Sequence, residues 1–146
     1  MKKLIAMAAI AAMGLAGIAG EHDTPRKSGD FCALTAGEKV YAGNLAVVCA
    51  TNGLGYAANT SAVGGTLTVC GVFRHNAAAG EKVLVERGGF ILENAASGTI
   101  EKKDIGATAY TVSANAWTVT KTSGTKAVGK VADVTDDGRV VVVVGK

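Results

Sequence analysis

The last third of the chain, residues 103–146, consists of short runs of apolar and β-branched residues separated by Gly, Asn, Asp or Ser. The runs cover residues 108–112, 117–120, 128–134 and 140–144. Runs of this length and composition, bounded by turn formers, predict β-strands joined by tight turns. Asp136, Asp137 and Gly138 lie between the last two runs and predict a hairpin. The five consecutive valines that follow predict a fully buried second strand.

Further strand candidates precede this stretch. They lie at residues 31–35, 39–42, 45–50, 56–58, 66–75, 82–86 and 90–92. Val83 and Val85 occupy alternate positions and are expected to point to one side. Gly88 and Gly89 predict a second hairpin between residues 82–86 and 90–92.

Composition supports the same fold class. The chain has 20 glycines, one proline and only 5% aromatic residues, which fits closely spaced strands and tight turns. No amphipathic run is long enough for the helical crossovers of a parallel sheet, and residues 93–99 resemble a surface loop. We therefore expect an all-β fold, a small antiparallel β-sandwich or barrel with an extended N-terminal arm, in which residues 31–146 form a single domain.

The first twenty residues form an apolar leader. Met1, Lys2 and Lys3 precede an uncharged run of small apolar residues from Leu4 to Ala19, the layout of a secretory signal peptide. The run is short for a transmembrane helix, which needs about 20 apolar residues, so we expect no permanent membrane span. Two other interpretations remain. The segment is an uncleaved arm or short apolar helix that packs against a partner, or it lies upstream of a true start at Met13.

Residues 21–30 are polar and include the only proline of the chain. A segment without an apolar face cannot fold alone, so it is expected to be an extended arm. Two interpretations are open: a solvated linker, or an arm that becomes ordered on contact with another protein.

Charge and cysteine content exclude some classes of protein. The net charge of +3 is modest and the basic residues are scattered among acidic ones, which argues against direct nucleic-acid binding. Cys32, Cys49 and Cys70 have no metal-binding spacing and cannot all pair within one chain. We expect small buried thiols in a reducing compartment, with one Cys49–Cys70 disulfide as the alternative.

The residues also indicate no enzyme. His22 and His75 are the only histidines, and neither has a neighbouring Cys or His at zinc-ligand spacing. The aspartates near Gly138 lack the ligand pattern of a calcium loop, and a hairpin turn explains them better. Trp117 is expected to be a packing residue of a strand. We expect no catalytic residues, no metal site and no cofactor.

The order of several sequence stretches resembles that of a known protein family. The stretches that carry this resemblance are DTPRKSG (23–29), KVYAGNLAVV (39–48), GYA (55–57), GVF (71–73), AAAGEKVLVERGGFILENA (77–95), KDIGATAYTVSANAWTVTKT (103–122) and AVGKVADVTDDGRVVVVV (127–144). Together they span most of the chain, and in this order the sequence resembles the head-decoration, or capsid cement, proteins of tailed bacteriophages. The leader departs from that family pattern, and a start at Met13 would shorten the departure.

The resemblance implies a structural virion protein, made in the host cytoplasm, that binds the outer surface of an assembled capsid at capsomer junctions and stabilises it. The implied partners are the major capsid protein and two further copies of the chain in a homotrimer. We expect the capsid contacts in the polar arm, whose backbone is free to add along a coat-protein strand or loop. The contact residues expected there are His22, Asp23, Thr24, Pro25, Arg26 and Lys27.

The leader supports a different function. If Met1 to Ala19 is a cleaved signal peptide, the remainder is an exported structural or adhesion module, periplasmic or extracellular. The mass of the mature chain separates the two functions.

Overall fold

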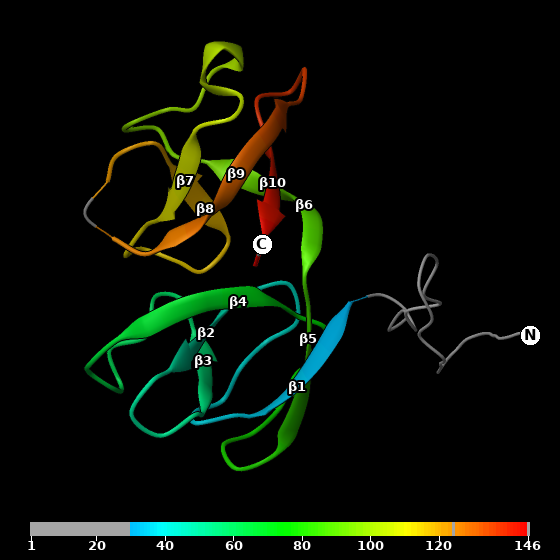
Figure 1. The fold of residues 1–146 in the computed structure, drawn as a ribbon, viewed down its shortest axis with the longest axis vertical. Helices are drawn as coiled ribbons and strands as arrows, with labels where there is room; N and C mark the ends of the chain where they lie inside the picture. Colours follow the sequence, from blue (N-terminus) through cyan, green and yellow to red (C-terminus); the bar gives the residue numbers. More distant parts are fainter. Residues whose placement is uncertain (1–29, 124, 146) are drawn as a thin grey trace, which may run out of the picture. The chain divides into compact units, whose positions relative to one another are not determined.

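The computed structural model describes residues 30–123 and 125–145 (Figure 1). Within these residues the fold is all-β, as predicted, with ten strands, one short 3₁₀ helix and no α-helix. The residues from Cys32 to Lys146 form one compact unit. The apolar leader and the polar arm up to Gly29 lie outside the described residues.

The first five strands form one sheet, here called the open sheet, in the order β1-β5-β4-β2-β3 (Figure 1). Their bounds are Phe31–Thr35 (β1), Leu45–Cys49 (β2), Gly55–Ala57 (β3), Leu67–Phe73 (β4) and Lys82–Glu86 (β5). The β2–β3, β2–β4 and β4–β5 pairs are antiparallel. An isolated parallel bridge between Ala36 and Gly55 links the end of β1 to β3, so the two edges of the sheet approach each other.

The other five strands form a closed barrel in the order β10-β6-β8-β7-β9. Their bounds are Gly88–Asn94 (β6), Thr108–Thr111 (β7), Thr118–Thr120 (β8), Ala127–Val134 (β9) and Val140–Val144 (β10), and the 3₁₀ helix η1 spans Lys102–Asp104. β10 pairs antiparallel with both β6 and β9, whereas β6 and β8 are parallel. The predicted all-β barrel is therefore confirmed, although its β6–β8 pair is parallel rather than antiparallel.

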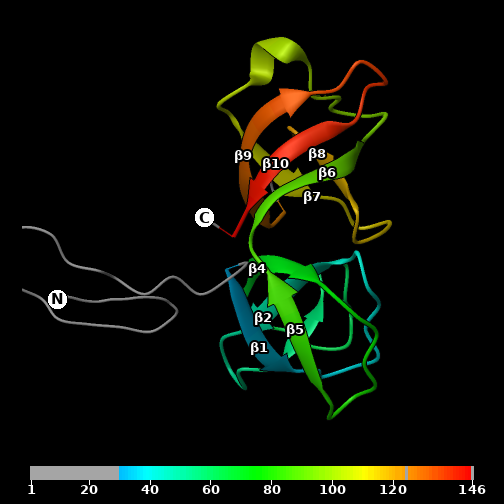
Figure 2. The same cartoon turned by 90° about the vertical axis from the view of Figure 1, so that its right-hand side faces the viewer.

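The predicted hairpin between residues 82–86 and 90–92 is also wrong. β5 ends at Glu86 and β6 begins at Gly88, so a single residue joins them, and a hairpin needs a loop of at least two residues. The chain instead passes from the open sheet directly into the barrel, where β6 pairs with β10 and β8 (Figure 2). β6 also extends to Asn94, into the expected surface loop.

The expected strand at residues 39–42 is reduced to one bridge between Val40 and Ala77. Gly43 follows with φ of 86° and turns the chain away, a conformation that glycine adopts without strain. The backbone N–H of Ala42 donates to the Asn76 side chain rather than to a strand. Side-chain and turn contacts therefore hold this segment.

The predicted hairpin of the C-terminal third is confirmed. β9 and β10 pair from Val134 opposite Val140 to Gly129 opposite Val144, with one register shift. Two backbone hydrogen bonds of Thr135 close the turn. Its N–H donates to the Arg139 carbonyl, and its carbonyl accepts from the Gly138 N–H.

The five-valine strand was predicted to be fully buried, but only three of its five valines are. Val140, Val142 and Val144 are fully buried, whereas Val141 and Val143 are partly exposed. Successive side chains of a strand point to opposite faces, and the barrel has an interior on one face only.

Two apolar clusters make up the core. The larger one contains residues of both sheets, among them Leu45 and Val47 of β2 and Val140 and Val142 of β10. The smaller one lies on the opposite face of the open sheet and centres on Phe73. Because β2 has an apolar cluster on each face, its sequence LAVVC is apolar throughout rather than alternating.

Candidate interaction surfaces

His75 has a structural role, whereas His22 lies outside the described residues. His75 is exposed, and its Nε2 accepts a hydrogen bond from the backbone N–H of Leu84 at 3.2 Å while Nδ1 lies 3.0 Å from the Asn76 carbonyl. The bond from Leu84 fastens the chain just after β4 to β5. In the described part of the chain, no group of three His, Cys, Asp or Glu side chains could hold a metal ion.

The three thiols are free. Cys49 belongs to the cluster shared with the barrel, whereas Cys70 packs on the Phe73 cluster, on the other face of the sheet. This placement excludes the Cys49–Cys70 disulfide that the sequence left open. Burial raises the pKa of the Cys70 thiol to about 12, with a further contribution from the nearby Cys32.

The aspartates near Gly138 shape the hairpin turn. Asp137 accepts hydrogen bonds from the Thr135 hydroxyl and from the Arg139 guanidinium, and its carboxylate lies 2.9 Å from the Arg139 terminal nitrogen. These bonds, the Thr135 bond foremost, lower the pKa of Asp137 to about 2. A turn held by its own side chains accounts for the whole Thr135 to Arg139 stretch.

Asn94, at the end of β6, holds two other segments against the barrel. Its amide nitrogen donates to the carbonyls of Ile100 at 2.8 Å and Gly138 at 3.0 Å, and its amide oxygen accepts from the Ile100 N–H at 2.9 Å. A single side chain therefore connects β6, the loop that leads to η1 and the β9–β10 turn.

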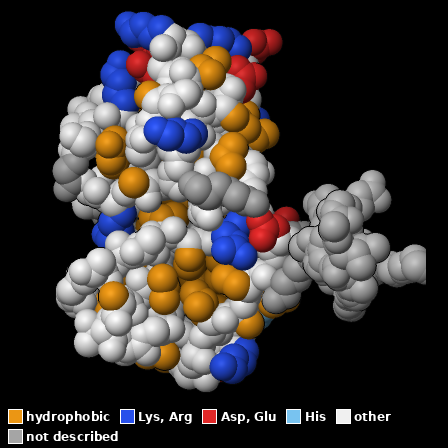
Figure 3. All heavy atoms as spheres, in the orientation of Figure 1, with side chains coloured by type: hydrophobic (Ala, Val, Ile, Leu, Met, Phe, Trp, Pro, Cys, Tyr) orange, Lys and Arg blue, Asp and Glu red, His pale blue; other side chains and the backbone are white. Residues whose placement is uncertain are grey.

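The end of the barrel that carries η1 is densely charged (Figure 3). Three ion pairs lie there, Lys103–Glu101 at 2.8 Å, Lys102–Asp133 at 3.1 Å and Lys121–Asp104 at 3.5 Å. The pairs are exposed and balanced in sign, so each contributes little to stability.

Trp117 is not the packing residue that the sequence predicted. Its side chain is 48% exposed, although its backbone is fixed. The Trp117 N–H donates to the Asn115 side chain at 3.0 Å, and its carbonyl accepts from the Glu93 N–H at 3.0 Å. The protein therefore presents a large aromatic ring to solvent from a rigid backbone position.

Other large apolar side chains are exposed as well. They are Tyr41, Leu84, Ile91 and Ile105. Ile91 of β6 lies opposite Val141 of β10, so the outer face of the barrel carries adjacent apolar residues. Hydrophobic side chains are visible on the surfaces of both sheets in Figure 3. Large apolar side chains that are exposed together often form contact surfaces for other proteins.

The capsid-contact residues expected in the polar arm, His22, Asp23, Thr24, Pro25, Arg26 and Lys27, lie outside the described residues. Among the described residues, no helix is long and apolar enough to cross a membrane. Comparison of the chain with protein-family models gives no match, and comparison with curated protein sequences gives none either.

Proposed function

We propose that this protein is a capsid-decoration protein: a structural component that binds the outer surface of an assembled phage head at capsomer junctions and stabilises it. The observation that carries the proposal is the order of segments from residue 23 to residue 144, which resembles the cement proteins of tailed phages. The partners in this proposal are the major capsid protein and, in a homotrimer, two further copies of the chain. Its location is the virion exterior.

The surface supports this proposal in a second way. Trp117, Ile91 and Ile105 each expose apolar area on a compact β unit. Aromatic residues in particular supply much of the binding energy of protein interfaces. Such residues suit a protein that makes several small contacts with a larger assembly.

Avidity explains how small contacts suffice. After one protomer of a trimer binds the lattice, the others bind at a high effective concentration, so overall affinity can exceed that of one contact by about 10² to 10⁴. A ligand that prefers the intact shell then stabilises that shell by mass action. This linkage opposes rupture of the head by packaged DNA.

The arm is the proposed capsid contact. The backbone from His22 to Lys27 can add along an exposed coat-protein strand, and Asp23, Arg26 and Lys27 can set its register by charge. Deletion of the chain through Gly29 should remove most of the binding while the described β unit stays folded.

A sedimentation assay tests the proposal. The protein is mixed with DNA-filled phage heads from its natural source, which have been stripped of surface proteins, and the pelleted fraction is measured. We expect saturable binding, strong loss on deletion through Gly29, and weaker binding for Trp117→Ala. Tyr41→Ala is the control for a generic loss of exposed aromatic area. Absence of binding to the heads at any concentration refutes the proposed function.

The second candidate, an exported β-domain protein, is favoured by the leader from Met1 to Ala19. Intact-mass measurement on protein from the natural source distinguishes the two. A mature chain that begins near Gly20 or Glu21 supports export, whereas retained Met1 or a start at Met13 supports the virion protein.

A further inference from the structure

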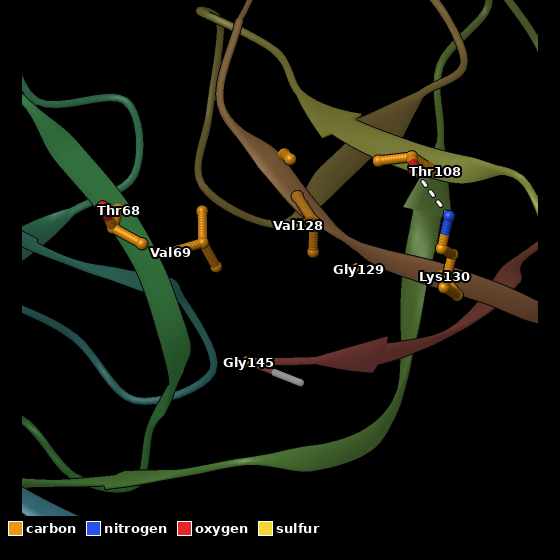
Figure 4. A pocket seen from close by; sticks show the side chains of 8 residues that line it. Thr68, Val69, Thr108, Val128, Gly129, Lys130 and Gly145 are labelled. Carbon is orange, nitrogen blue, oxygen red and sulfur yellow. Dashed lines mark hydrogen bonds between the residues drawn. The ribbon is translucent and has the colours of Figure 1, made fainter.

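A hollow of about 380 Å³ lies between β4 of the open sheet and part of the barrel, where it is lined by β9, by Thr108 of β7 and by Gly145, which follows β10 (Figure 4). Val69 of β4 and Val128 of β9 extend into it from opposite sides, and both are nearly buried. The hollow therefore has an apolar floor. Its volume lies near the lower end of the range of about 300–1,000 Å³ that is typical of ligand sites.

One wall of the hollow is a strand edge. β2 pairs with β4 along residues 67–72, whereas β5 pairs with it only at Val72 and Phe73, because the chain leaves the open sheet after Glu86. Among the described residues, no strand pairs with that second edge of β4 from Leu67 to Cys70. Backbone N–H and C=O groups of a strand alternate between its two edges, so this edge offers hydrogen bonds to a further strand.

Two observations place this edge beside the hollow. Thr68 and Val69 line the hollow directly. Gly145, which also lines it, lies so near the edge that a side chain there would meet the Cys70 carbonyl oxygen at 2.7 Å. Gly145 therefore covers the edge at Cys70, and a peptide that added to β4 between Leu67 and Val69 would run through the hollow.

The opposite wall carries a positive charge. Lys130 of β9 is exposed, and its ammonium donates to the Thr108 hydroxyl at 3.2 Å (Figure 4). Among the described residues, Lys130 has no carboxylate partner within ion-pair distance. An ammonium has three donors, so at least one remains for a ligand beside the threonine bond. The charge complementarity therefore favours an acidic ligand.

We propose that this groove binds an extended peptide segment of a partner protein, which adds to the free edge of β4 and places an Asp or Glu carboxylate against Lys130. Main-chain hydrogen bonds to the edge would supply affinity, and the apolar floor and the ammonium would select the side chains. About three residues of extended chain, roughly 10 Å, match the exposed part of the edge. The inference depends on the groove alone and not on the proposed capsid function.

Nuclear magnetic resonance with the ¹⁵N-labelled full chain tests the site. The probe is the peptide N-acetyl-Thr-Val-Asp-Val-amide, and the comparisons are the same peptide with Asn in place of Asp, and sodium acetate alone. We expect saturable shifts in the millimolar range at the amides of Thr68, Val69, Val128 and Lys130. The Asn peptide should bind more weakly, and acetate should give no shifts along β4.

Two variants and a matched control sharpen the test. Lys130→Gln should weaken binding of the Asp peptide about threefold to fivefold, as expected for an exposed ion pair, and should remove the preference over the Asn peptide. Thr68→Glu places a competing carboxylate at an exposed position of the groove and should weaken binding of the Asp peptide further. Lys82→Gln is the control, because Lys82 is also an exposed strand lysine that donates to a threonine hydroxyl, Thr35, at 3.0 Å.

The proposal is overturned by any of three results. The Asp peptide causes no saturable shifts, or acetate alone reproduces the β4 shifts, or Lys82→Gln weakens binding as much as Lys130→Gln does. The first result excludes strand addition at this edge, the second reduces the site to an anion contact, and the third shows a general charge effect.

Discussion

Two isoleucines that lie close in sequence differ almost completely in burial, and this difference predicts different responses to the same substitution. Ile100 is 1% exposed and belongs to the larger core cluster, whereas Ile105, at the end of η1, is 48% exposed. Ile100→Ala removes three buried carbons, whose burial contributes about 0.8 kcal/mol each. It also leaves a cavity, which the backbone cannot readily fill because Asn94 holds it at Ile100 by two hydrogen bonds. We expect a loss of about 3 to 4 kcal/mol in the free energy of unfolding.

Urea unfolding followed by tryptophan fluorescence measures the effect. With a denaturant dependence of about 1.5 to 2 kcal/mol per molar urea, Ile100→Ala should lower the unfolding midpoint by about 2 M. Ile105→Ala should change the free energy by less than about 0.5 kcal/mol. If Ile100→Ala leaves too little folded protein, Ile100→Val should still cost about 1 kcal/mol. Equal midpoints for the Ile100 and Ile105 variants would refute the assignment of Ile100 to the core.

Three further predictions concern single polar groups. Asn94→Ala should lower the free energy of urea unfolding by about 1 to 3 kcal/mol, because it leaves the backbone N–H and carbonyl of the buried Ile100 without their side-chain partner. An unchanged free energy of unfolding would contradict this role of Asn94. The folded-state pKa of Asp137 is lowered from 3.8 to about 2 by the Thr135 and Arg139 bonds. The stabilisation of the fold by the ionised Asp137 carboxylate is therefore present above about pH 4 and is lost as pH falls toward 2. Asp137→Asn should accordingly flatten the acid side of the curve of unfolding free energy against pH. The raised pKa of Cys70 leaves almost no thiolate at pH 8. Alkylation there with iodoacetamide, followed by mass spectrometry, should be slow until the protein is unfolded, and rapid labelling of the folded chain would contradict its burial.

Features that depend on neighbours in sequence were predictable. The β9–β10 hairpin follows from a turn of Asp136, Asp137 and Gly138 between two β-branched runs, and the alternation of Val83 and Val85 correctly places both on one buried face. In these cases the local pattern contains the physical cause, namely turn chemistry or the period of the strand.

Features that depend on distant strands were not predictable. The direct passage from β5 into β6 and the parallel pairing of β6 with β8 are decided by which edges the barrel must close. No short sequence pattern encodes this choice, because pairings between distant segments depend on the whole core. The exposed position of Trp117 was likewise not predictable from its neighbours in sequence.

The five-valine strand shows why an exposed apolar residue is not always evidence of a binding surface. A strand made of one residue type has no chemical difference between its faces, so closure of the barrel alone turns Val141 and Val143 outward. Small side chains exposed in this way are ordinary on a monomer. Trp117 is different, because a backbone fixed by hydrogen bonds presents a large aromatic ring to solvent. Binding assays that vary Trp117 therefore test function more directly than those that vary the valines.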